Sequence, residues 1–321
     1  MSGQGVILAV CIGERRGTPK RAVSSVQSIR GHGLQGDAHA GNWHRQVSML
    51  ADEEIAEVRR AGLVVEPGDF GENLITSGLD FAELAVGRRF RVGQQAVLQI
   101  TQRGKECHSR CKIYERLGDC IMPREGLFAR VRRSGRIGAG DAVHLDPELD
   151  RVRWAVCTVS DRSAAGGRPD ASGTTVCGLL EGCLGNGRVS YKVLADEQDA
   201  ISDELRRLCD EEVCDVVVTT GGTGLSPRDV TPEATLAVVE RLIPGMAEAI
   251  RAAGLGHTPH AMLSRAVCGL RGQTIIVNLS GSPKAAREQL AVVLPVLQHA
   301  IATASGIPDD CGRPDPRHGD G

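Results

Sequence analysis

The chain has 321 residues, a formal net charge of -2 and only 2% aromatic residues. This length exceeds that of one ordinary core and predicts two domains. The near-neutral charge and the scarcity of aromatic residues argue against binding to nucleic acid. The most apolar run, residues 290–304, is too short for a membrane span and is interrupted by Pro295. Because no charged-then-apolar leader opens the chain, we expect a cytoplasmic protein without a membrane partner.

The first half carries the pattern of a mainly-β domain. Short apolar segments separated by glycines predict strands at residues 5–12, 46–50, 89–92, 96–101 and 140–145. Helical patterns are confined to residues 52–61 and 111–117. Regularly punctuated short strands of this kind favour a closed or partly closed β-barrel.

Three clusters of glycine, charged and sulfur-containing residues stand out in this half, at residues 33–48, 67–74 and 104–126. Their candidate zinc ligands are His39, His44, Cys107, His108, Cys111 and Cys120. Zinc is disfavoured because Cys107 and Cys111 are loosely spaced and no second close pair completes a tetrahedral set. The alternative is an anion pocket with a reactive thiolate, because Lys105, His108 and Arg110 would favour the ionised form of a cysteine.

The three clusters together resemble the MOSC domain, which is similar to the C-terminal domain of molybdenum cofactor sulfurases, over roughly residues 5–144. The resemblance implies that Cys111, in an Arg-Cys context, carries sulfur or binds molybdenum, and a soft thiolate suits either role. Cys120 is the second choice because it follows Asp119. A buried structural role for Cys111 is the alternative. Lys20, Arg45 and Arg124 fit the phosphate of the molybdenum cofactor by residue type, but the resemblance does not fix their roles. Binding of molybdenum and of pyridoxal phosphate is also expected.

A short polar segment, residues 146–150, separates the two halves and contains Pro147. We therefore predict one domain at residues 1–147 and a second at residues 151–306. Residues 307–321 are rich in proline, glycine and charge, so we expect a disordered tail there.

In the second half, strand and helix patterns alternate. Strands are predicted at residues 152–159, 189–194, 213–220 and 274–279, and helices at residues 174–184, 197–209, 232–242 and 283–302. This alternation predicts an α/β three-layer fold with a mainly parallel sheet. Ligands of such sheets bind at the carboxyl ends of the strands.

The run TTGGTGLSPRDVTPEAT, residues 219–235, is the most informative motif. A β-branched strand leads into glycines 221, 222 and 224, which leave no side chain between the backbone and a ligand. Thr231 is the expected N-cap of the next helix. Strand, glycine turn and helix N-terminus together predict a phosphate cradle, with Arg228 and Asp229 beside it. The alternative is an ordinary strand-to-helix turn.

This run resembles the MogA/MoaB family, whose members transfer adenylate to molybdopterin. Residues 159–162, 196–198 and 278–284 match the family in the same order, so the resemblance spans roughly residues 152–306. One departure is Ser280, where the family usually carries proline.

The resemblance implies ATP and molybdopterin as substrates, with Asp196 and Asp229 as catalytic residues and Mg²⁺ ligands. The alternatives are a helix N-cap for Asp196 and a turn carboxylate for Asp229. The remaining ligand-binding residues implied are Ser160, Asp161, Gly221, Gly222, Thr223, Gly224, Arg228, Thr231, Ser264, Arg265, Gly281, Ser282 and Pro283. By analogy we also expect a homo-oligomer, a trimer, and contacts with other molybdenum cofactor enzymes.

Two domains of one pathway on one chain predict a role in molybdenum cofactor biosynthesis, with adenylyl transfer as the assignable activity. Two other classes remain open from the sequence. One is a non-catalytic molybdopterin carrier, and the other is a sulfur-transfer protein centred on Cys111.

Overall fold

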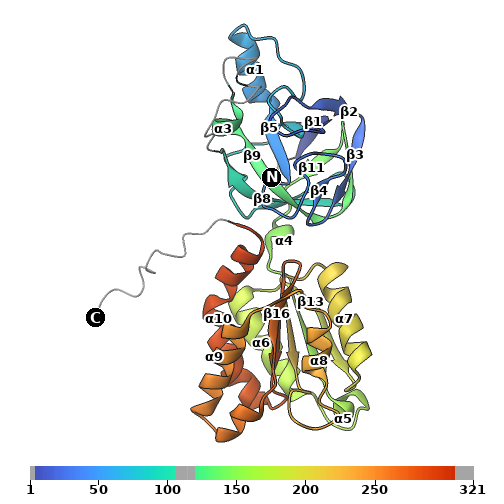
Figure 1. Cartoon of the computed structure of the whole chain (residues 1–321), viewed down its shortest axis with the longest axis vertical. Helices are drawn as coiled ribbons and strands as arrows, with labels where there is room; N and C mark the ends of the chain where they lie inside the picture. The colour runs from blue at the N-terminus through green and yellow to red at the C-terminus, as the bar shows by residue number, and fades with distance from the viewer. Residues whose placement is uncertain (1–3, 106–113, 115–119, 308–321) are drawn as a thin grey trace, which may run out of the picture. The chain divides into compact units, whose positions relative to one another are not determined.

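The computed structural model describes residues 4–105, 114 and 120–307 (Figure 1). The described residues fold as two compact units, one of those up to Asp150 together with Gly306 and Ile307, and the other of residues 151–305. The expected tail, apart from Ile307, and the helix expected at residues 111–117, apart from Tyr114, lie outside the described residues.

The first unit contains a closed barrel of seven strands, which confirms the barrel predicted from the sequence. The ring runs in the order β1, β11, β7, β8, β9, β5 and β6, and the pairing of β6 with β1 closes it. The strands are β1 (Gln4–Ile12), β5 (Val47–Ala51), β6 (Leu74–Ser77), β7 (Arg89–Val92), β8 (Ala96–Arg103), β9 (Leu127–Arg133) and β11 (Ala142–His144). Only β5 and β6 pair in parallel within the ring; every other pair is antiparallel.

Short elements decorate the barrel. They are β2 (Arg21–Val23), which pairs with β1, a three-stranded sheet of β3 (Ser25–Ile29), β4 (Gly33–Leu34) and β10 (Gly135–Gly138), and the helices α1 (Asp52–Arg60), α3 (Met122–Glu125) and α4 (Pro147–Asp150). Strand β9 is not among the strands predicted from the sequence, although Leu127, Ala129 and Val131 alternate along it with Phe128, Arg130 and Arg132. Both arginines are buried. The barrel interior is filled by aliphatic side chains, with Phe90 among the largest that are fully buried.

The second unit is built on a six-stranded sheet in the order β13, β12, β14, β17, β16, β15. Its strands are β12 (Trp154–Val159), β13 (Arg188–Leu194), β14 (Val216–Thr220), β15 (Arg241–Leu242), β16 (Cys268–Arg271) and β17 (Thr274–Leu279). The first four strands in this order pair in parallel, whereas β16 is antiparallel to both of its neighbours, β17 and β15. The sheet is therefore mainly parallel.

Helices cover both faces of this sheet, and β12 shows how the sequence directs them. Trp154 and Val156 pack into one apolar cluster, whereas Ala155 and Cys157 pack into another, as expected when side chains alternate between faces. The first cluster includes residues of α6 (Ala171–Leu184), α9 (Pro244–Leu255) and α10 (Pro283–Ala304). The second includes residues of α7 (Gln198–Asp210) and α8 (Thr231–Leu236) (Figure 1).

The helix predicted at residues 232–242 is wrong in its second half. Helix α8 ends at Leu236, and residues 241–242 form β15, which pairs antiparallel with β16. The apolar residues after Leu236 fit a helical period, but pairing with Leu270 and Gly269 supplies the backbone hydrogen bonds that a longer helix would have provided. Tertiary pairing therefore overrides the local pattern.

Helix α10 begins after Ser282, whose hydroxyl accepts a hydrogen bond from the amide of Ala285. It packs on the sheet through Leu290, Val293 and Leu297 and contains Pro295 in its interior. Neither α10 nor any other helix in the described part of the chain is long and apolar enough to cross a membrane.

Candidate active site of the second unit

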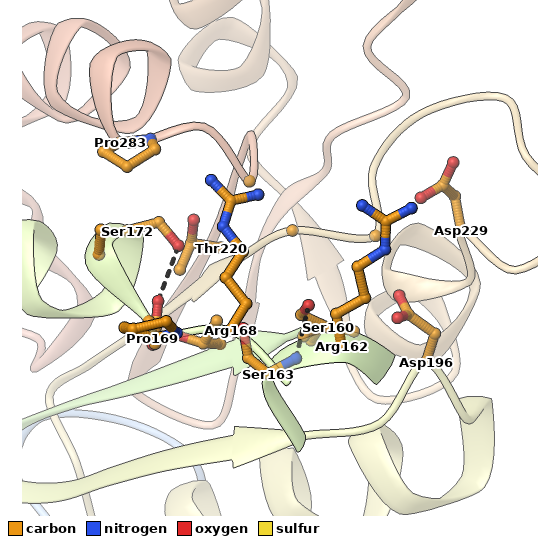
Figure 2. Close-up of a pocket in the computed structure, with 17 residues that line it drawn as sticks. Ser160, Arg162, Ser163, Arg168, Pro169, Ser172, Asp196, Thr220, Asp229 and Pro283 are labelled. Atoms are coloured by element: carbon orange, nitrogen blue, oxygen red, sulfur yellow. Dashed lines mark hydrogen bonds between the residues drawn. The ribbon is translucent and has the colours of Figure 1, made fainter. Parts of the chain in front are cut away.

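Four parallel strands end at one edge of the sheet of the second unit. Their last residues are Val159, Leu194, Thr220 and Leu279, and the register pairs Thr158 with Thr220 and Thr220 with Leu279. A cavity of about 230 Å³ opens at this edge (Figure 2). Residues that follow all four of these strands line it, together with residues of the first turns of α6 and α10. Among them are Ser160, Arg162, Arg168, Ser172, Asp196, Gly221, Gly222, Asp229, Gly281 and Pro283.

The turn after β14 requires glycine. Gly221 and Gly222 have φ angles of 101° and 61°, which favour glycine. A Cβ atom on Gly221 would lie 2.2 Å from the carbonyl oxygen of Val159, and one on Gly222 would lie 2.4 Å from Thr231 Oγ1. A Cβ on Gly222 would also lie 3.0 Å from Asp196 Oδ1. The bare backbone of this turn therefore leaves room in front of the Asp196 carboxylate.

Asp196 is held by a reciprocal pair of hydrogen bonds. Its Oδ2 accepts from the amide of Asp161 at 2.8 Å, and the carboxylate of Asp161 accepts from the amide of Asp196 at 3.0 Å. The N-cap of α7 is Glu197, so the alternative interpretation of Asp196 as that N-cap is wrong. Burial raises the pKa of Asp196, and the negative charges of Asp161 and Asp229 raise it further.

Asp229 lies on the other side of the glycine turn. Its Oδ2 accepts a hydrogen bond from the amide of Ser226 at 2.8 Å, and a Cβ on Gly224 would lie 2.9 Å from the same oxygen. Two carboxylates that repel each other across a glycine turn are a donor set suited to Mg²⁺, which takes one or two carboxylates and completes its shell with phosphate and water. Within the described ranges, no group of three or more His, Cys, Asp or Glu residues is arranged to hold a metal by itself.

A second cavity, of about 420 Å³, adjoins the first. Gly222, Asp229 and Gly281 line both, so Asp229 stands at their boundary. The wall of the second cavity also includes Thr223, Gly224, Thr258, His260, Leu263, Ser264 and Gln289. Ser280 also lines it, and its amide and hydroxyl bond to the Gln289 side chain at 2.8 Å each. Two ligands bound in these cavities would meet beside Asp229.

Four arginines surround the site, and two of them are already paired. Arg228 binds the carboxylates of Asp161 and Glu197, each at 2.9 Å, and its hydrogen bonds lower the pKa of Asp161. Arg265 donates to the carbonyl oxygens of Gly224 and Asp229 and forms an ion pair with Glu233. Both arginines therefore brace the loop that carries Asp229.

Arg162 and Arg168 differ from this pair. Both line the first cavity, and their guanidinium groups form no hydrogen bond or ion pair with any residue that the structure describes. Figure 2 shows both side chains extending from the segment after β12, between Pro283 and Asp229. They leave two positive charges available to an anionic ligand.

Comparison with known proteins matches both units. Residues 155–299 match the family model described as "Probable molybdopterin binding domain", and residues 36–144 match that of the MOSC domain. The molybdopterin adenylyltransferase of Helicobacter pylori strain J99 is 40% identical over 154 residues, covering 48% of this chain and 88% of that protein. That of Escherichia coli strain K12 is 39% identical over 143 residues, covering 44% of this chain and 73% of that protein. The chain belongs to the MogA/MoaB family of molybdopterin-binding proteins.

Solved structures of the family cover the same region. The molybdopterin biosynthesis enzyme MoaB of Thermus thermophilus is 46% identical, covers 49% of this chain and 98% of its own, and has a TM-score of 0.47. The two family models confirm the predicted fusion of an N-terminal MOSC domain with a C-terminal MogA/MoaB-type domain.

The structure brings many of the residues predicted from the sequence to the two cavities. Those lining one or both are Ser160, Asp196, Gly221, Gly222, Thr223, Gly224, Asp229, Ser264, Gly281 and Pro283. The predicted residues outside both linings are Asp161, Arg228, Thr231, Arg265 and Ser282. These five hold neighbouring segments in place through the hydrogen bonds and caps described here.

Thr231 is not the N-cap of α8, contrary to the prediction. Val230 occupies that position, and the buried Thr231 hydroxyl donates to the carbonyl oxygen of Gly221 at 2.9 Å. No residue of the short helix α8 lines the first cavity. The first turns of α6 and α10 line it instead, through Ser172 and Pro283. The start of α6 could have been predicted from Asp170, a residue type favoured at helix N-caps. Asp170 is the N-cap of α6, and its side chain accepts a hydrogen bond from the amide of Gly173.

Of the two candidate thiols in the MOSC domain, Cys111 lies outside the described residues. Cys120 is 7% exposed and belongs to an apolar cluster with Ile121, Met122 and Phe128.

Proposed function

We propose that the second unit transfers adenylate from ATP to molybdopterin, as a step of molybdenum cofactor biosynthesis. The observation that carries this proposal is the pair of adjoining cavities that share Asp229, Gly222 and Gly281. Adenylyl transfer must bring two polyanions into contact at one point, and a shared wall with a carboxylate and bare backbone suits that requirement. The adenylyltransferase relatives, about 40% identical, support the same reaction.

The cavity with Arg162 and Arg168 receives the triphosphate in this proposal, because these are the unpaired cations among the described residues of its wall. The cavity lined by His260 and Leu263 receives the pterin. An oxygen of the molybdopterin phosphate attacks the α-phosphorus of ATP, a new P–O bond forms, and the bond to the β-phosphate breaks. Pyrophosphate leaves with its negative charge balanced by the two arginines.

Asp196 and Asp229 would hold Mg²⁺, whose role when bound is to neutralise phosphate charge. Burial and the negative charges of Asp161 and Asp229 raise the pKa of Asp196, and a cation held by Asp196 and Asp229 would offset that repulsion. Asp161 and Arg228 act as positioning residues, since they hold Asp196 and the loop around Asp229 through hydrogen bonds.

The test is Asp229→Asn, assayed by pyrophosphate release from ATP with molybdopterin. Removing one electrostatic group of this kind typically lowers the rate about 10²–10³-fold. Asp203→Asn is the matched control, because Asp203 is an exposed carboxylate of α7 paired only with Arg206 among the described residues. If the wild-type chain bound molybdopterin but released no pyrophosphate, the unit would be a carrier rather than an enzyme.

For the MOSC unit we propose a role in handling the cofactor, with Cys111 as the residue that carries sulfur or molybdenum. Mass spectrometry of the intact protein would detect a persulfide or bound metal, and Cys111→Ser should remove it. Adenylyl transfer should continue in that variant, because the proposed transferase residues all belong to the other unit.

A further inference from the structure

Glu288 brings a second carboxylate to the cavity of about 420 Å³ in the second unit. Asp229 is the other acidic residue in the described lining of this cavity. Glu288 lies in the second turn of α10, and its neighbours Ala285 and Gln289 line the same cavity. Residues three or four positions apart share one face of a helix, so this face of α10 forms part of the cavity wall.

The carboxylate of Glu288 has no close partner among the described residues. Its Oε1 lies 3.7 Å from His257 Nδ1 and 4.0 Å from Lys284 Nζ, and both separations exceed the length of a hydrogen bond. Gln289 differs, because its side-chain amide pairs with the amide and the hydroxyl of Ser280. Glu288 is therefore the side chain on this face of α10 that can accept hydrogen bonds from a ligand.

Part of the same wall is small and apolar. Gly254 belongs to α9, Ala261 and Leu263 belong to the 3-10 helix η1 (Pro259–Leu263), and Ala285 belongs to α10. The glycine lets α9 approach η1 closely, because a Cβ atom on Gly254 would lie 2.8 Å from the Cβ of Ala261. Apolar walls suit the faces of a flat ring, and a polar group among them decides which edge of the ring is accepted.

The chemistry of a carboxylate restricts the edge that it can recognise. An ionised glutamate has two acceptor oxygens and no donor. It suits a ligand edge with two adjacent N–H donors and disfavours an edge that carries a carbonyl oxygen, which would leave two acceptors facing each other. The 2-amino-4-oxopyrimidine ring of a pterin has such a donor edge, formed by its ring N–H and its amino group.

We propose that Glu288 is the specificity-determining residue for the pterin ring, and that its carboxylate accepts hydrogen bonds from the ring N–H and the amino group. The inference rests on the proposed function for the place of the pterin in this cavity. It does not rest on turnover, because recognition of the ring precedes adenylyl transfer and can be measured without ATP.

Two ring systems that differ at one position test the proposal. 6-Hydroxymethylpterin has an amino group at position 2, and 6-hydroxymethyllumazine has a carbonyl oxygen there. Both rings fluoresce, so titration of each with the full-length protein in the absence of ATP gives its dissociation constant. The wild-type chain should bind the pterin about 10- to 100-fold more tightly, because the lumazine places an acceptor against the carboxylate.

Glu288→Gln should reverse this preference. The new amide turns its own NH₂ group towards the amino group of the pterin, so binding of the pterin should weaken about 10- to 100-fold. The same NH₂ group can donate to the carbonyl oxygen of the lumazine, whose binding should strengthen. Glu248→Gln is the matched control, since Glu248 is an exposed carboxylate of α9 outside the cavity lining. It removes the same charge and should leave both affinities unchanged.

Equal affinities of the wild-type chain for the two rings would overturn the proposal, and so would an equal change for both rings in Glu288→Gln. Guanosine has the same donor edge on a purine, and tighter binding of guanosine than of the pterin would also overturn it. If Glu288→Gln does not fold by thermal melt, Glu288→Asp takes its place. It should weaken binding of the pterin because the shorter side chain withdraws the carboxylate, and an unchanged affinity would count against Glu288.

Failure of this inference is distinguishable from failure of the proposed function. If the wild-type chain released no pyrophosphate but its preference for the pterin still depended on Glu288, the unit would be a carrier and the role of Glu288 would stand. If pyrophosphate were released but Glu288→Gln left the ring preference unchanged, adenylyl transfer would stand and the role of Glu288 would fall.

Discussion

The cavities of the two units differ in the charged side chains that line them. In the second unit, Asp196 and Asp229 face the glycine turn, and cations reach the cavity from the side through Arg162 and Arg168. In the barrel, Arg45 and Lys105 line a cavity of about 170 Å³, and the nearby acids are turned away into ion pairs and backbone hydrogen bonds. A site with only cations binds an anion and leaves it unchanged. A site with mixed charges, able to hold a metal ion beside a phosphate, suits a reaction in which charge moves.

The largest effect should come from Asp196→Asn. If the carboxylates of the second unit take part in adenylyl transfer, this change should lower the rate of pyrophosphate release about 10²–10³-fold. The fold should survive, because an asparagine oxygen still accepts the hydrogen bond from the amide of Asp161. An assay at saturating Mg²⁺ beside a thermal melt measures both quantities. Unchanged turnover would remove Asp196 from the reaction.

Gly222→Ala should have the next largest effect, because the new Cβ would push against Thr231 Oγ1 and the Asp196 carboxylate. A displacement of about 1 Å at a reacting group costs roughly 10²-fold in rate. Gly166→Ala separates this from backbone strain, since Gly166 also has a positive φ, 74°, but nothing lies within 4 Å of its Cβ position. Equal losses of activity in both variants would mean that strain alone is responsible.

Arg168→Gln tests whether the cations of the second unit serve the triphosphate. Because Arg168 is exposed, we expect a modest loss, about 3- to 10-fold in kcat/KM for ATP, together with weaker inhibition by pyrophosphate. Arg162→Gln should behave alike. Arg206→Gln removes one positive charge from the same unit, at a residue paired with Asp203, and should leave both parameters unchanged. If Arg206→Gln changed both parameters as much as Arg168→Gln, the loss would come from the net charge of the unit and not from the position of Arg168.

The smallest expected effect is a pH dependence of the stability of the barrel unit, caused by the buried carboxyl group of Glu72. Burial raises the pKa of Glu72 from 4.5 to about 7. A raised pKa means that the folded unit binds the proton more tightly than the unfolded one, so stability is fully present below about pH 4.5 and is lost as the pH rises through about 7. Hydrogen–deuterium exchange of barrel amides should therefore quicken over this range beyond its intrinsic pH dependence. Glu72→Gln should remove that excess, and its persistence would assign it to another group.

Much of the fold could be predicted because it rests on local patterns. The β-branched run of β14 and the alternation of β12 are periodic signals, and the structure places both strands within two or three residues of the predicted bounds. The convergence of Asp196 and Gly221 at one sheet edge followed from the rule that parallel strands end together. The failures, such as the helix predicted through residues 241–242, occur where a distant strand offers hydrogen bonds that the local pattern does not show.

The sequence by itself determined which chemical groups are available: the glycine turn, the two carboxylates, the family to which the chain belongs, and a barrel rich in short strands. Only the tertiary structure decided which charges are free. Arg228 and Arg265 stand in the motif regions yet are neutralised by Asp161 and Glu233, which lie 67 and 32 residues away in the chain. Arg162 and Arg168 stay available to a ligand. The sequence shows which residues are charged. Which of them form ion pairs depends on the distances between side chains after folding, and a local sequence pattern does not predict those distances.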